Sequence, residues 1–139
     1  SGYIASRSPR RTRRGWGMTI GEILDAIANA DGEASIIFDF GGISPTKVDS
    51  WRGSYDEAAI GFSSGQYGEP CVTVKQFRAA LQIALTPGVT YSGWKGGEYQ
   101  YTKSTPLHVD NRGCYSNTEI SRVEVQDWGV ILHTDREAQ

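Results

Sequence analysis

The sequence predicts an α+β domain with a mostly antiparallel sheet and two helices packed on one face. Two capping boxes each precede an amphipathic run, which indicates two helices. Short β-branched runs, separated by turns rich in glycine, asparagine and aspartate, indicate strands after each helix. The order helix, strands, helix, strands is typical of the α+β class. The chain of 139 residues is long enough for one domain, which we expect over residues 18–139.

The first helix is expected over about residues 19–29. Thr19 and Glu22 are spaced so that each side chain can accept a hydrogen bond from the other residue's backbone N–H. The apolar residues that follow at helical spacing are Ile20, Ile23, Leu24 and Ile27. Asn29 and the Asp31-Gly32 pair then end the helix.

The second helix begins at a capping box of the same kind, formed by Thr73 and Gln76. It is expected to stop before Pro87-Gly88, because proline cannot continue a helix. The residues predicted to line its buried face are Val74, Phe77, Leu81 and Ala84.

The segment from Ala34 to Phe40 is β-branched and aromatic, and it predicts a central strand that ends at Gly41-Gly42. The other strands are expected at 47–52, 57–62, 98–102, 107–110, 118–125 and 129–133. Turns are expected at Asn111-Arg112-Gly113 and Asp127-Trp128-Gly129.

The net charge of −2 conceals an uneven distribution. Residues 1–17 hold five of the fourteen basic residues and no acid, so the remaining nine basic and sixteen acidic residues carry −7. An acidic body lacks the basic face that DNA or RNA binding needs, so we expect no DNA partner. We expect residues 1–17 to be a disordered basic leader or a cloning remnant. A functional arm for nucleic acid or membrane is the alternative.

Cysteine, histidine and apolar patterns exclude several other classes. Cys71 and Cys114 lie far apart without a CxxC motif, which favours free thiols in a cytosolic protein. His108, Asp110 and His133 are too few ligands for a zinc site, so no metal and no cofactor are expected. No apolar run approaches the roughly 18 residues of a membrane span.

Two short patches combine flat rings, cations and glycines. The first holds Trp51 and Arg52, followed by Gly53-Ser54-Tyr55. In the second, Gly93-Trp94 precedes the candidate ligand residues, which are Lys95, Glu98, Tyr99 and Tyr101. Rings can stack on a base, cations can meet phosphate, and an acid can accept from ribose hydroxyls. The structural alternatives are a strand end with Trp51 in the core and a plain glycine turn after Lys95.

Two further segments add polar candidates. Asn111 and Arg112 would supply an amide for a base edge and a cation for phosphate. Thr118 and Arg122 would form a rim for ribose or phosphate. A capped turn beside a solvent-exposed Arg122 is an equally good interpretation of the second pair.

The motifs favour binding over catalysis. The order of the residues around Lys95 is not that of a Walker A loop. Glu98 is a single acid, and one acid alone does not define a hydrolase. We therefore expect a protein that is not an enzyme. A nucleotide hydrolase that uses Glu98 and a protein-interaction module remain the alternatives.

From Met18 to about Thr134 the chain resembles the phage anti-Thoeris sponge proteins of the first type. The residues that carry the resemblance are Ile36-Ile37-Phe38-Asp39-Phe40, Ser50-Trp51-Arg52-Gly53-Ser54-Tyr55, Trp94-Lys95-Gly96-Gly97-Glu98-Tyr99 and Asn117-Thr118-Glu119-Ile120. Members of that family sequester the cyclic ADP-ribose signal made by a bacterial TIR-domain defence enzyme.

This resemblance implies a sponge that binds a cyclic ADP-ribose-type nucleotide without cleaving it, in the cytoplasm of an infected bacterial host. It also implies a homo-oligomer, dimer or hexamer, with ligand pockets at subunit interfaces. Separate sites for cyclic oligonucleotides are a further possibility within the family.

Overall fold

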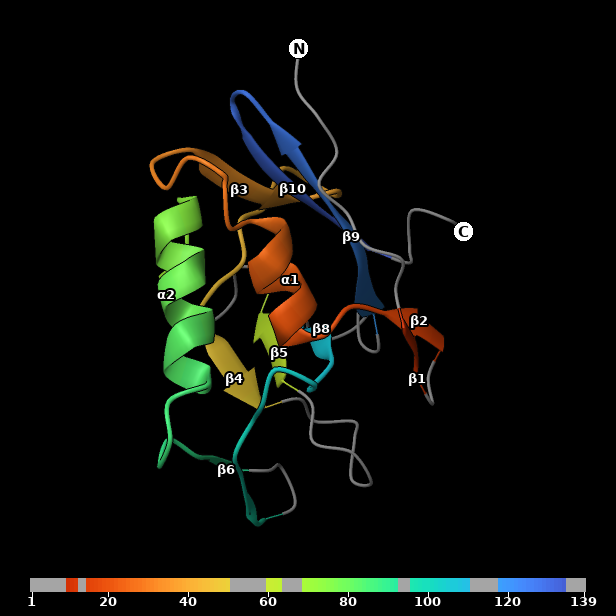
Figure 1. The fold of residues 1–139 in the computed structure, drawn as a ribbon, viewed down its shortest axis with the longest axis vertical. Helices are drawn as coiled ribbons and strands as arrows, with labels where there is room; N and C mark the ends of the chain where they lie inside the picture. Colours follow the sequence, from red (N-terminus) through yellow and green to blue (C-terminus); the bar gives the residue numbers. More distant parts are fainter. Residues whose placement is uncertain are drawn as a thin grey trace.

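The computed structural model describes residues 10–12, 15–50, 60–63, 69–92, 96–110 and 118–134. Strands and two helices alternate along this part of the chain (Figure 1). Their bounds are β1 Arg10–Thr12, β2 Gly15–Gly17, α1 Ile20–Ala26, β3 Ser35–Phe38, β4 Val48–Ser50, β5 Ile60–Ser63, α2 Val74–Ala84, β6 Tyr91–Ser92, β7 Glu98–Tyr99, β8 Leu107–Asp110, β9 Thr118–Gln126 and β10 Gly129–Thr134.

Six strands form one sheet in the order β3-β10-β9-β8-β5-β4. The β3–β10 and β5–β8 pairs are parallel, and the other three pairs are antiparallel. A mostly antiparallel sheet with two helices confirms the α+β class. The packing of both helices on one face stays a prediction.

The expectation that the strand near 34–40 is central is wrong, because β3 is an edge strand of the sheet. Its apolar character has another cause. The backbone N–H of Phe38 donates to Ile43 O (2.8 Å), and that of Ile36 donates to Val72 O (3.3 Å). Loop residues therefore cover the outer edge of β3, and Ile36 and Phe38 are buried as they would be in a central strand.

Both helices begin at the expected capping boxes. The side chains of Thr19 and Thr73 accept from the backbone N–H of Glu22 and Gln76. The side chains of Glu22 and Gln76 accept in turn from the backbone N–H of Thr19 and Thr73. The buried residues of α2 are the four predicted ones, Val74, Phe77, Leu81 and Ala84. The first helix is shorter than expected, because α1 ends at Ala26 and a turn follows. Arg78 of α2 donates to the carbonyl of Ile27 (2.9 Å) and so stabilises that end.

The sheet changes partners along β9. The first residues of β9 pair with β8, at His108↔Glu119 and Val109↔Thr118, and its remaining residues pair with β10. Met18 fills the fork that opens between β8 and β9. Its N–H donates to Ile120 O (2.8 Å), and its carbonyl accepts from Leu107 N (3.2 Å). Met18 is fully buried, so the domain core begins at this residue.

The described residues at the end of the expected leader form two short strands. Arg10–Thr12 and Gly15–Gly17 pair as the β1–β2 hairpin, which lies beside β9. Gly17 is buried, and a Cβ at this position would collide with the Glu119 carboxylate. The assignment of residues 1–17 as a leader or cloning remnant stays a prediction. Residues 1–9 and 13–14 lie outside the described part.

Several other expectations concern residues that lie, wholly or in part, outside the described part of the chain. The strands expected at 47–52 and 57–62 appear as β4 and β5, but residues 51–59 are not described. The turn at Asn111-Arg112-Gly113 and Cys114 also lie outside. Cys71 is buried and free, and burial raises the pKa of its thiol. No helix in the described residues is both long and apolar enough to cross a membrane.

The close approach of β10 to β3 generates a stability prediction. An alanine Cβ at Gly129 would overlap the Ser35 carbonyl oxygen and lie 3.1 Å from its carbon. We expect Gly129→Ala to lower the free energy of unfolding by about 1–3 kcal/mol, measured by urea denaturation. Gly32→Ala is the matched control, because its Cβ would meet Lys75 Cβ at an ordinary 3.4 Å. Equal stability of the two variants would contradict this close contact between the strands.

Candidate functional site

The structure places the strand that precedes the first predicted patch beside the strand that precedes the second. The chain leaves β4 at Ser50, directly before Trp51 and Arg52. β4 contacts β6, the first strand of the hairpin that carries the second patch. Figure 1 shows the arrow of β4 pointing toward that hairpin. Trp51 and Arg52 themselves, and Lys95, lie outside the described residues.

The β6–β7 hairpin has a defined register, with Tyr91 opposite Tyr99 and Ser92 opposite Glu98. Gly96 and Gly97 have φ values of 101° and 83°, a conformation that L side chains rarely adopt. Glu98 is exposed and accepts a hydrogen bond from Thr90 Oγ1 at 3.3 Å. The glycine turn is therefore required by backbone geometry, and it leaves the carboxylate of Glu98 at the surface.

The two predicted stacking tyrosines have different surroundings. Tyr99 is half-buried, and its hydroxyl is 3.7 Å from the point where a Cβ on Gly97 would stand. Tyr101 is 2% exposed and stacks on Tyr91, with ring centroids 5.2 Å apart. The expected strand 98–102 is only Glu98–Tyr99, so alternation does not place both rings on one open face. Tyr101 supports the hairpin from the core, and Tyr99 is the more accessible ring.

Sequence reasoning missed Tyr91. It is half-buried and holds Tyr101 from the opposite side of the hairpin. The available signal was its spacing of eight residues from Tyr99 across a glycine-rich turn, which is compatible with a hairpin.

The strand ends next to a second group of predicted ligand residues lie at the other end of this part of the sheet. β8 ends at Asp110, before Asn111 and Arg112, and Val109 pairs with Thr118 at the start of β9. Ser50 of β4 pairs with Ile60, and Ile60 pairs with Leu107 at the start of β8. The chain therefore leaves β4 and β8 at opposite ends. Asn111, Arg112 and the side chain of Thr118 are outside the description.

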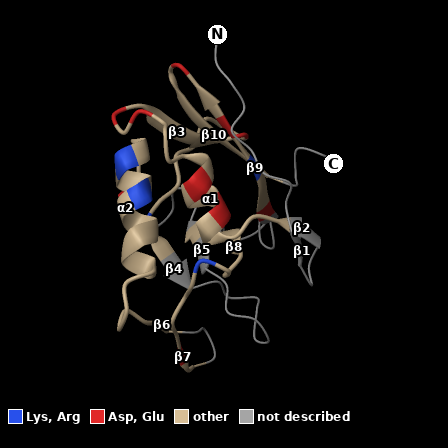
Figure 2. Ribbon diagram, in the orientation of Figure 1, with Lys and Arg blue, Asp and Glu red and all other residues tan. Residues whose placement is uncertain are grey.

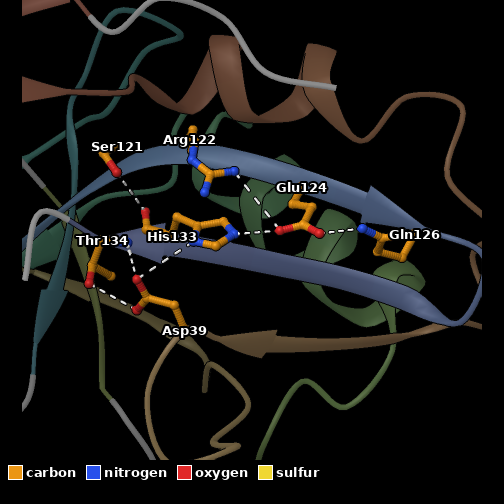
Figure 3. A network of polar contacts seen from close by, with 7 residues as sticks. All are labelled: Asp39, Ser121, Arg122, Glu124, Gln126, His133 and Thr134. Carbon is orange, nitrogen blue, oxygen red and sulfur yellow. Dashed lines mark hydrogen bonds and ion pairs between the residues drawn. The ribbon is translucent and has the colours of Figure 1, made fainter. Parts of the chain in front are cut away.

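Arg122 belongs to a third place, a polar network on β9, β10 and the end of β3 (Figure 3). Arg122 Nη1 lies 3.9 Å from Glu124 Oε1, and the same oxygen is 2.7 Å from His133 Nε2. Gln126 Nε2 donates to the other oxygen of Glu124. The hydrogen bonds from Gln126 and then from His133 lower the pKa of the Glu124 carboxyl, and the nearby charges of His133 and Arg122 add to this effect.

Asp39 holds the opposite side of the His133 ring. Asp39 Oδ2 is 3.8 Å from His133 Nδ1 and accepts from Thr134 N at 2.9 Å. Asp39 Oδ1 accepts from Thr134 Oγ1 at 3.0 Å. The hydroxyl of Ser121 donates to the His133 carbonyl, not to its ring, so it is not set up as a nucleophile. These contacts join three strands and leave Arg122 as the most exposed charge, at 37%.

The histidines expected to be too few for zinc do not converge. His108 on β8 faces Glu119, with 3.9 Å between Nδ1 and Oε1, whereas His133 lies on β10 across the intervening β9. In the described part of the chain no three His, Cys, Asp or Glu side chains gather so as to hold a metal ion.

Neither helix N-terminus is open to a phosphate. The first amides of α2, on Val74 and Lys75, donate to the carbonyls of Ala34 and Gly32, each at 2.9 Å. Those of α1 donate to the carbonyls of Thr105 and Lys103. Because these donors are already used, phosphate recognition here requires cationic side chains or loop amides.

Comparison of the chain with family models, with curated proteins and with solved structures gave no match.

The network around Glu124 predicts a pH-dependent contribution to stability. We expect Glu124→Gln to lower the free energy of unfolding at pH 7 by about 1–3 kcal/mol, because charged hydrogen bonds are lost. The folded pKa of Glu124 lies below its ordinary value of 4.5, so the contribution is complete above that pH and disappears as the pH falls through the folded value.

The difference in stability between wild type and variant should therefore narrow in acid, as followed by urea denaturation from pH 7 to pH 3. Glu33→Gln, on an exposed loop, is the control and should have little effect at any pH. A Glu124→Gln deficit that persists unchanged at pH 3 would show that lost packing is the cause.

Proposed function

We propose that this protein binds a cyclic ADP-ribose-type nucleotide and sequesters it without cleavage, in the cytoplasm of an infected bacterial host. The observation that carries the proposal is the contact between β4 and β6. It brings the strand that leads into Trp51 and Arg52 beside the hairpin that carries Glu98 and Tyr99. The strands that precede two patches about forty residues apart in sequence thus lie together, and this supports a shared ligand site.

Each part of such a ligand has a matching group there. The half-buried ring of Tyr99 offers a face for adenine, and the exposed carboxylate of Glu98 can accept from ribose hydroxyls. Arg52 and Lys95 are the nearest cations in sequence for the pyrophosphate. The positive-φ glycines Gly96 and Gly97 allow a ligand to approach the backbone closely.

The remaining predicted residues suit a site completed by a second copy. Asn111, Arg112 and Thr118 follow or begin strands at the end of the sheet opposite to Ser50. In a two-fold dimer, this end of one protomer can meet the patch of its partner, and each pocket then occurs twice. We therefore propose a homo-oligomer, dimer or hexamer, with shared pockets.

Sequestration requires affinity and slow release, with no bond cleavage. Glu98 is hydrogen-bonded to the Thr90 hydroxyl, and this arrangement differs from the paired carboxylates of many hydrolases. The alternatives are still a nucleotide hydrolase that uses Glu98 and a protein-interaction module.

One experiment separates the three functions. The protein is mixed with a cyclic ADP-ribose isomer, free ligand is removed by filtration, the protein is heat-denatured, and the supernatant is analysed by chromatography. A sponge returns the intact nucleotide, an enzyme returns product, and an interaction module retains nothing. Recovery of product, or of no nucleotide, would overturn the proposal.

The structure of the β6–β7 hairpin predicts which tyrosine ring contributes to nucleotide binding. Tyr99→Ala should weaken nucleotide binding by about 1–3 kcal/mol in calorimetry, the range for base–aromatic stacking, while the melting temperature changes little. Trp128→Ala is the matched control, because Trp128 is 53% exposed on the β9–β10 turn. Tyr101→Ala should instead lower stability, because its ring is in the core. Unchanged nucleotide affinity in Tyr99→Ala would show that the pocket does not include this ring.

The cations give a separate prediction. Arg52→Ala and Lys95→Ala should each reduce nucleotide affinity roughly tenfold or more, because charge-assisted contacts to phosphate are lost. Arg122→Ala should have a smaller effect, because Arg122 is close to Glu124 in the polar network. Lys75→Ala on the exposed face of α2 is the control. Affinity that is untouched by both Arg52→Ala and Lys95→Ala would exclude this site for an anionic ligand.

A further inference from the structure

The β6–β7 hairpin has an aromatic face and a polar face. Its register places Tyr91 opposite Tyr99 and Ser92 opposite Glu98. Cross-strand partners share a face, and neighbours along a strand lie on opposite faces. Both tyrosines are partly buried against the core, and Tyr91 stacks on the buried Tyr101. The exposed side chain of Glu98 therefore belongs to the outer, polar face of the hairpin.

Thr90 holds the carboxylate of Glu98 on this face. It directly precedes β6, and its Oγ1 donates to Glu98 Oε1 at 3.3 Å. Threonine is branched at Cβ and has few side-chain rotamers, so its hydroxyl is a donor in a restricted position. No residue in the described part of the chain donates to the other oxygen, Oε2. An ionised carboxylate accepts hydrogen bonds and donates none, so Oε2 is suited to a ligand that brings a hydroxyl group.

The aromatic and polar faces meet at the outer edge of β7. Among the described strands, β7 pairs only with β6, so a ligand can lie across its other edge. A nucleotide whose adenine stacks on Tyr99 would reach Glu98 across this edge. The part of the ligand attached directly to adenine is its ribose, which carries hydroxyl donors. The phosphates are further from the base, and the carboxylate would repel them.

We propose that Glu98 makes the nucleotide site select a free hydroxyl on the adenosine ribose over a phosphorylated one, and that Thr90 is the positioning residue for its carboxylate. The inference rests on the proposed function and specifies which nucleotides the site accepts. Because Thr90 already restricts the side chain of Glu98, less conformational freedom is lost when the ribose binds. A phosphate on that hydroxyl would remove the donor and bring roughly two negative charges beside the carboxylate.

The test compares two probes by calorimetry on the full chain. One is the cyclic ADP-ribose isomer used in the filtration experiment. The other is the same isomer with a phosphate on a free hydroxyl of its adenosine ribose. We expect the wild type to bind the phosphorylated probe about tenfold more weakly, or weaker still. Glu98→Gln keeps the shape of the side chain and removes its charge, so its two affinities should differ by no more than about threefold.

Variants of Thr90 separate positioning from folding. Thr90→Val keeps the shape but cannot donate, so it should bind the unmodified probe several-fold more weakly and discriminate less between the probes, at an unchanged melting temperature. Thr90→Ser keeps the hydroxyl and should restore both affinities. Thr86→Val is the matched control, because the exposed Thr86 also donates through Oγ1, but to Gln82 O of α2 at 3.0 Å. This control should leave both affinities unchanged.

Failure of this inference can be distinguished from failure of the proposed function. If the wild type binds neither probe, the nucleotide-binding function is wrong and the inference falls with it. If the unmodified probe binds, equal or tighter binding of the phosphorylated probe overturns the inference alone. Discrimination at the wild-type level in Glu98→Gln or in Thr90→Val overturns it as well.

Discussion

The insertion of Met18 between β8 and β9 is the constraint on which the rest of the domain depends. The two strands pair at only two positions and then separate, which would leave backbone groups of Leu107 and Ile120 without a ladder partner inside the core. Met18 satisfies both, and an unmade buried hydrogen bond of this kind costs on the order of 1–3 kcal/mol. The same segment then enters α1, whose first amides bond to the carbonyls of Thr105 and Lys103. The chain between β7 and β8 is thereby fixed, and with it the base of the β6–β7 hairpin.

β9 also organises the polar interior. It contributes Glu119 toward His108 on one neighbouring strand and Glu124 toward His133 on the other. In sequence, such histidines and acids invite a catalytic or metal-binding interpretation. In the structure the Glu124–His133 contact belongs to a network that joins β3, β10 and β9, as Figure 3 shows. A side chain whose hydrogen bonds are used to hold strands together is poorly placed to exchange protons with a ligand.

Local signals predicted local structure well. The capping boxes and the buried face of α2 depend on residues three or four apart, so the sequence contains all of the relevant information. The position of β3 could not be found in this way, because apolar composition reports burial and does not identify the covering loop. Burial of Gly17 depends on Glu119, about a hundred residues away. The role of Tyr101 was missed because alternation was extended beyond the two residues of β7.

The candidate site could be predicted only as a set of residue types. The patches were recognisable because rings, cations and glycines are adjacent in sequence, whereas the contact between β4 and β6, the strands that precede them, depends on the fold. The acidic charge of the domain makes the grouping of cations within the patches important. The ribbon in Figure 2 marks acidic residues on α1 and in several turns, while α2 carries Lys75 and Arg78.

An anionic nucleotide approaching such a body gains nothing from the overall field, so attraction must come from cations within a few ångströms of its phosphates. Salt then has two opposing effects. It screens the repulsion from the distant acids, which are separated from the ligand by water, more strongly than the attraction inside a closed pocket. The proposed binding of a small anion in an enclosed site should therefore depend only weakly on salt, in contrast to a ligand whose contacts face solvent and release counterions.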